Sequence, residues 1–138
     1  MTRQELRNYI SLKGEIAELR QELAELERTA PVVTDTVQGS TPEAPYTLHA
    51  VTVSGIDPKA AKAINEKRRR LRFLIDRCET QREEIRTWID QIPDSTVRRI
   101  FRLRYMSGLS WVQIAHRLES YRSPEAVRKI HDRFLKKF

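Results

Sequence analysis

Two long series of apolar residues at heptad spacing constrain the fold of this chain most strongly. In the first, six apolar residues from Tyr9 to Leu26 recur at alternating intervals of three and four residues. In the second, five residues from Ile64 to Ile92 are spaced by seven, with further apolar residues between them. A narrow apolar stripe with charged flanks is typical of a coiled-coil helix. We therefore expect long coiled-coil helices over 1–29 and 58–92, which pair as a hairpin or with copies of the chain.

Local signals mark the ends of these helices. Thr2 and Glu5 have the spacing of a capping box, in which both side chains bond backbone amides at a helix start. Pro31 disfavours helical dihedrals in the residue before it, so the first helix should end near Thr29. Asp57 followed by Pro58 predicts an N-cap and the first residue of the second helix.

Residues 30–57 form the linker between the two helices. They lack the heptad pattern and are rich in proline, glycine, threonine and valine. Tyr46, Leu48 and Ala50 alternate with Thr47 and His49, as residues of a strand do. A connection of this length is far above the roughly 2 to 8 residues usual between helices. A short β segment and a mobile loop therefore both remain open.

The segment 93–138 carries a different pattern, that of three short helices. Asp94 or Ser95 can cap the first, and Gly108 can accept the left-handed conformation that often ends a helix. Two further helix starts are predicted after Gly108. Ser110 and Gln113 have the spacing of a capping box, and Ser123-Pro124-Glu125 places an N-cap residue, a proline and an acid in the order typical of a first turn. The expected fold class is all-α, with long coiled-coil helices followed by a C-terminal three-helix helix-turn-helix domain.

Charge separates this C-terminal segment from the rest of the chain. The protein has 26 basic and 19 acidic side chains, a net charge of +7. Residues 1–93 carry 15 of each sign, whereas residues 94–138 carry 11 basic and four acidic side chains. A compact cationic unit attracts polyanions, with double-stranded DNA as the first candidate.

The last predicted helix has a polar face suited to reading DNA. Burial of Val127, Ile130 and Phe134 leaves the following residues outward: Glu125, Ala126, Arg128, Lys129, His131, Asp132 and Arg133. In a major groove, arginine and lysine donate to guanine, glutamate accepts from cytosine, and an alanine methyl contacts thymine. We expect base reading by four residues near the start of this helix: Glu125, Ala126, Arg128 and Lys129.

Residues 98–138 resemble region 4 of bacterial RNA polymerase sigma factors. The resemblance rests on S-W-V-Q-I-A-H-R-L, from Ser110, followed by S-P-E-A-V-R-K-I-H, from Ser123. With the heptad-bearing helices and the segment containing Gly39-Ser40 and 43–46, the whole chain is similar to phage and prophage late-gene regulators of the ArpU and RinA kind. No equivalent of sigma region 2 is present in the sequence, which argues against an autonomous sigma factor.

The resemblance implies roles for particular residues. The positions matching Glu125, Arg128 and Lys129 read the upstream promoter element in sigma region 4. Lys129 departs from the glutamine common there, so a changed base preference is expected. Neighbouring residues contact phosphates in such domains, and here we expect that role for Ser110, Arg117, Arg122, Ser123, Arg133 and Lys136.

Other kinds of site are not indicated by the sequence. Cys78 and the three scattered histidines do not have the spacing of metal ligands, and we interpret Cys78 as a core residue. No cofactor motif and no set of catalytic residues is recognisable. His116 and His131 are expected at the surface, and Trp111 in the core or at a phosphate-facing edge. The sequence has no apolar run long enough to span a membrane and no secretion signal, so we expect a cytoplasmic protein and no enzyme.

The expected function is sequence-specific binding of double-stranded DNA by a homo-oligomeric transcription regulator. It is most simply a phage late-gene activator, with host RNA polymerase as a further partner. Two alternatives remain: a phage small terminase subunit, and a protein-interaction adaptor that does not read DNA. The basic run Arg68, Arg69, Arg70 and Arg72 is either a solvated face that pairs in part with glutamates of the first helix or an additional phosphate-contacting patch.

Overall fold

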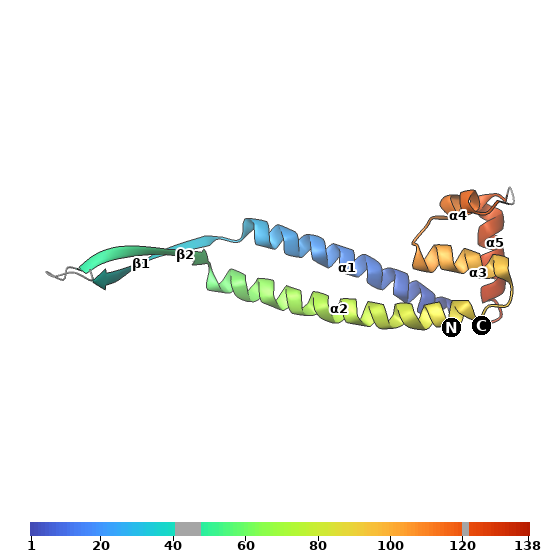
Figure 1. The fold of residues 1–138 in the computed structure, drawn as a ribbon, viewed down its shortest axis with the longest axis horizontal. Helices are drawn as coiled ribbons and strands as arrows, with labels where there is room; N and C mark the ends of the chain where they lie inside the picture. The colour runs from blue at the N-terminus through green and yellow to red at the C-terminus, as the bar shows by residue number, and fades with distance from the viewer. Residues whose placement is uncertain (41–47, 120–121) are drawn as a thin grey trace. The chain divides into compact units, whose positions relative to one another are not determined.

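A computed structural model describes residues 1–40, 48–119 and 122–138, with side chains described outside 33–54. The chain is mostly helical, as expected of an all-α protein, but a pair of strands joins the two long helices (Figure 1). The elements in chain order are α1 (Arg3–Thr29), β1 (Val32–Ser40), β2 (Leu48–Ile56), α2 (Pro58–Asp90), α3 (Ser95–Phe101), the π-helical segment η1 (Arg102–Met106), α4 (Trp111–Arg117) and α5 (Pro124–Leu135).

The capping box at the start of α1, the end of α1 and the first residue of α2 are confirmed. At the start of α1, the Thr2 amide donates to Glu5 Oε2 at 2.6 Å and the Glu5 amide donates to Thr2 Oγ1 at 3.2 Å. Helix α1 ends at Thr29, and α2 begins at Pro58. These helix ends are local in origin because each is specified by residues within one turn.

The linker forms an antiparallel β-hairpin where the structure describes it. Strands β1 and β2 pair from Val32 opposite Ile56 to Ser40 opposite Leu48. The Asp57 amide donates to the Pro31 carbonyl at 3.0 Å, which brings the end of α1 beside the start of α2. Of the two interpretations left open, ordered β structure is the one observed; the part of the predicted alternation at 46–47, and the 43–46 motif, lie outside the described residues.

The chain divides into two compact units, and both long helices contribute to each. The unit formed by 17–72 contains the hairpin and the adjoining parts of α1 and α2. Lys67 pairs with Glu22 at 3.1 Å and Arg68 with Glu27 at 2.6 Å, both at the surface. The two helices thus pair with each other within one chain, and Arg68 of the basic run pairs with a glutamate of α1, as one interpretation expected.

The second unit consists of 1–16 and 73–138. Its main core joins the first turns of α1 and the last turns of α2 to the C-terminal helices, through Leu6, Tyr9, Ile85, Ile89, Ile92, Val97, Phe101, Tyr105 and Leu135. The Trp88 ring meets Phe101 at 5.5 Å and Phe134 at 6.0 Å between centroids. The boundary expected between 92 and 93 therefore falls inside one unit, because the end of the second heptad series packs on α3 and α5.

No helix in the described ranges has the length and apolar character needed to cross a lipid bilayer.

Candidate nucleic-acid interface

Helix α5 begins as its sequence predicts. Ser123 is the N-cap, and its hydroxyl accepts the Ala126 amide at 3.1 Å, with Pro124 at the first position of the helix. The cap fixes where the first turn starts, which decides the directions of the side chains that follow. Glu125, Arg128 and Lys129 are exposed and Ala126 is half-buried, while Val127 between them is fully buried.

Helix α4 is positioned by a complete capping box. Ser110 Oγ accepts the Gln113 amide at 3.3 Å, and Gln113 Oε1 accepts the Ser110 amide at 2.9 Å. Upstream, Gly108 has a φ of 68°, which allows the chain to leave η1 and enter α4. The predicted turn residue and cap are therefore both confirmed.

A small second core holds α4 and α5 against α3. It consists of Ile100, Ile114, Leu118 and Val127, none of them more than 4% exposed. Each of the three helices thus presents an apolar residue to the same cluster. Rigid placement of α5 relative to α4 follows, because close-packed cores of this kind do not deform continuously.

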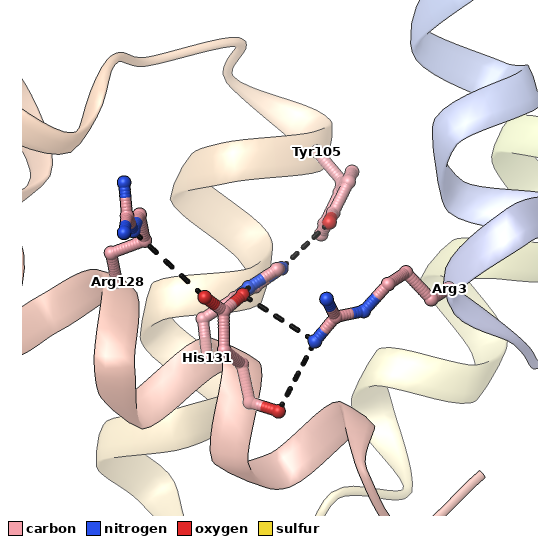
Figure 2. A network of polar contacts seen from close by, with 5 residues as sticks. Arg3, Tyr105, Arg128 and His131 are labelled. Carbon is pink, nitrogen blue, oxygen red and sulfur yellow. Dashed lines mark hydrogen bonds and ion pairs between the residues drawn. The ribbon is translucent and has the colours of Figure 1, made fainter.

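A polar network links residues of α1, η1 and α5 (Figure 2). Tyr105 Oη lies 2.7 Å from His131 Nε2, and His131 Nδ1 lies 3.0 Å from Asp132 Oδ1. An ionised Asp132 can only accept, so we assign the proton to Nδ1, and Nε2 accepts the Tyr105 hydroxyl. With this assignment, a neutral histidine joins η1 to α5.

The same carboxylate also interacts with two arginines. Arg3 Nη2 lies 3.7 Å from Asp132 Oδ1 and donates to the Asp132 carbonyl at 3.4 Å, while Arg128 Nε lies 3.9 Å from Asp132 Oδ2. Figure 2 shows Arg3 approaching from α1 and Arg128 from α5 itself. The first turn of α1 is thereby held against α5.

The prediction that His131 is a surface side chain is wrong. His131 is 6% exposed, stacked on Phe101 at 4.7 Å and met by the Trp111 ring at 4.9 Å between centroids. Burial lowers its pKa, an effect that the hydrogen bond to Asp132 opposes. Burial also raises the pKa of Tyr105 to about 12.

The buried stripe of α5 accordingly differs from the predicted one. Val127, His131 and Leu135 are buried at intervals of four, whereas Ile130 and Phe134 are only half-buried. A prediction based on hydrophobicity assigns Ile130 rather than a histidine to the interior. Trp111 is half-buried, with the Arg104 guanidinium 4.5 Å above its ring, so its indole packs within the unit.

The residues predicted to contact phosphates do not form a single patch. Ser110 and Ser123 use their hydroxyls to cap α4 and α5, and Arg122 lies next to the second cap. Arg133 and Lys136 are exposed at the opposite end of α5, about 15 Å and about 20 Å along the axis from Ser123. Arg117 lies at the last turn of α4, where it borders a hollow with Arg99 and Arg102 rather than with Ser110.

A larger hollow of about 560 Å³ lies between α4 and the start of α5. It is lined by Val112, Ala115, His116, Leu118, Glu119, Arg122 and Pro124. His116 is exposed here, in the position expected of a surface side chain. In the described ranges, no three histidine, cysteine or acidic side chains are grouped so that they could hold a metal ion. The arrangement offers exposed hydrogen-bond donors and acceptors on a rigid helix, which suits recognition of a polar surface.

Comparison with known proteins adds no relative to this chain. No family model matches it, and neither the curated proteins nor the solved structures include a significant match. The resemblance to sigma region 4 accordingly rests on the residues of the chain itself.

Proposed function

We propose that this protein binds double-stranded DNA in a sequence-specific manner and regulates transcription. In this proposal α4 and α5 are the two helices of a helix-turn-helix, and α5 enters the major groove. The observation that carries the proposal is the start of α5, where the first two turns after the Ser123 cap expose Glu125, Arg128 and Lys129 over buried Val127 and His131.

The chemistry of these side chains supports base reading. Arginine and lysine can donate to guanine O6 and N7, and glutamate can accept from the cytosine amino group. The Arg128 side chain is 61% exposed, and its ion pair with Asp132 is long at 3.9 Å. Its guanidinium can therefore leave that carboxylate for a base edge at small cost, because exposed ion pairs contribute little.

Charge supports the same surface. The chain's net charge of +7 arises entirely from residues 94–138, which lie within one unit. Lysine and arginine contacts to phosphates supply much of the affinity of proteins for DNA and make it salt-dependent. Together with the resemblance to sigma region 4, these observations favour a phage late-gene regulator that acts with host RNA polymerase.

We also propose that the chain forms a homo-oligomer through a coiled coil. Leu19, Leu23 and Leu26 of the first heptad series remain half-buried although α1 pairs with α2 within the chain. A second copy can cover such a stripe, and doubling the DNA-binding unit raises avidity. Light scattering at micromolar concentration should give at least twice the 16.3 kDa mass of one chain; a monomer contradicts this part of the proposal.

A protein-interaction adaptor is a second candidate, favoured by one observation. Val112 is 54% exposed and borders the hollow between α4 and α5, so this face offers apolar surface to a protein partner. An adaptor docks without reading bases. Specific DNA binding is therefore the property that separates the two candidates.

A competition gel shift on a duplex obtained by selection tests the proposal. Arg128→Ala and Lys129→Ala should each lose about 1 to 3 kcal/mol of specific affinity, while affinity for random duplex changes less. Arg133→Ala, at a predicted phosphate contact, should weaken all sequences similarly. Arg86→Ala is the matched control because Arg86 is exposed on α2 and pairs with Glu83. If Arg128→Ala and Lys129→Ala both keep full specificity, base reading by α5 is wrong.

A further inference from the structure

Three arginines border a separate hollow of about 290 Å³ beside α3 and α4. Arg99 belongs to α3, Arg102 begins η1, and Arg117 ends α4; Leu103 completes the lining. Arg99 and Arg102 are three residues apart on continuous helix and so share a face. Arg117 reaches the same hollow from a different element, which makes this a convergence in space rather than a run in sequence.

Among the described residues, an acidic partner is present for one of these three arginines. Arg102 pairs with Asp90 at 3.0 Å, at the surface. Within the described part of the chain, no ion pair is recorded for Arg99 or Arg117, and both are exposed. The last turn of α4 favours a cation at position 117 through the helix dipole. That effect does not account for Arg99 and Arg102, whose charges repel Arg117 across the hollow.

The backbone changes its helical form at this place. The Ser107 amide donates to the Arg102 carbonyl at 3.2 Å, a π-type bond, and η1 continues α3 from Arg102 to Met106 in π-helical form. π-Helical turns are rare and are found frequently at functional sites. Here the change begins at one of the three arginines.

We propose that Arg99, Arg102 and Arg117 form a binding site for a phosphate group. Guanidinium groups match phosphate oxygens in bidentate geometry, and several around one hollow place donors on more than one side of the anion. Leu103 supplies an apolar wall that limits hydration of the ion pairs. The phosphate belongs either to the DNA backbone or to a small phosphate-bearing ligand. Arg117 is one of the residues already expected to contact phosphates; the site adds Arg99 and Arg102 to it, and its DNA-backbone form rests on the proposed function.

The direct test is a titration with inorganic pyrophosphate, followed by NMR of the arginine Nε–Hε signals in the full-length protein. Saturable shifts should be confined to Arg99, Arg102 and Arg117. Arg99→Gln/Arg117→Gln should weaken pyrophosphate binding by at least about tenfold. The control Arg20→Gln/Arg77→Gln removes the same charge from exposed positions on α1 and α2 and should bind as the wild type does. Arg99→Lys/Arg117→Lys should bind with intermediate affinity, since charge is kept and bidentate geometry is lost.

A second arm distinguishes the sources of the phosphate. If the DNA backbone occupies the site, Arg99→Gln/Arg117→Gln should reduce the slope of log affinity against log salt for random duplex by about 1.8, or 0.9 per lost contact. If a small ligand occupies it, the slope should equal that of the control variant while pyrophosphate binding is lost. Equal loss of pyrophosphate binding in both double variants, or shifts spread over all arginines, overturns the proposal. Neither readout depends on sequence-specific binding, so failure of the site and failure of the proposed function are separable.

Discussion

Removal of the Tyr105 hydroxyl tests the buried network that supports α5. Tyr105 and His131 are 5% and 6% exposed, and their polar atoms lie 2.7 Å apart. In Tyr105→Phe, His131 Nε2 loses its donor in a place that water does not reach. A buried acceptor without a partner costs about 1 to 3 kcal/mol, so the free energy of unfolding should fall by that amount.

A double-mutant cycle separates the hydrogen bond from other effects of the substitution. In the wild type, the His131 ring stacks on Phe101 with 4.7 Å between the two centroids. His131→Phe keeps an aromatic ring on Phe101 but leaves the Tyr105 hydroxyl without its acceptor. In Tyr105→Phe/His131→Phe the hydrogen bond is replaced by apolar contact. The double variant should therefore be more stable than the sum of the single losses predicts, by about 1 to 2 kcal/mol.

Urea unfolding followed by tryptophan fluorescence suits this measurement. Trp88 and Trp111 both lie in the same unit as the network, and Trp111 contacts His131 directly. The midpoint should move while the slope with urea stays constant, at one fixed protein concentration. A Tyr105→Phe variant within about 0.3 kcal/mol of wild type, or a cycle without coupling, refutes the reasoning, because it means that the hydrogen bond does not stabilise the fold.

Three further predictions concern the same unit. Burial lowers the pKa of His131 below its ordinary 6.5, so the unfolded chain takes up a proton at a higher pH than the folded protein does. The free energy of unfolding should therefore fall as the pH drops below 6.5. His131→Phe should reduce this pH dependence, as measured by urea unfolding at several pH values. Gly108→Ala should lower the free energy of unfolding by about 1 to 2 kcal/mol, because residue 108 has a φ of 68°. Steric contact adds little, since the new methyl group meets only Lys13 Nζ at 3.7 Å. Thermal unfolding measures the loss. Ser123→Ala should cost about 1 kcal/mol by leaving the Ala126 amide uncapped, and Ser123→Asp should restore most of it; an uncapped variant as stable as wild type contradicts the role of the cap.

Features encoded within one helical turn were predictable from sequence. Thr2, Ser110 and Ser123 cap their helices as expected, and Gly108 adopts the positive φ that its position required. Each of these signals combines a side chain with backbone amides only two or three residues away. The distant parts of the fold do not affect them, which is why a single sequence was sufficient.

Features that depend on distant residues were not predictable in the same way. His131 is buried because Phe101 and Tyr105, about 30 residues earlier, surround its ring and supply a hydrogen bond. Leu6 lies before the heptad series and was not assigned to the core, yet it is 1% exposed. The grouping of Arg117 with Arg99 likewise arises from the packing of α4 on η1, which continues the helix that carries Arg99. Periodicity identifies a helix face but not the element that covers it.

Selection of binding sites from a random duplex library tests the central claim most directly. The account predicts that the wild-type protein enriches a defined motif. It also predicts that Arg128→Ala or Lys129→Ala loses preference at particular base pairs while the rest of the motif persists. The account is contradicted if no motif is enriched, or if both variants enrich the same motif as the wild type.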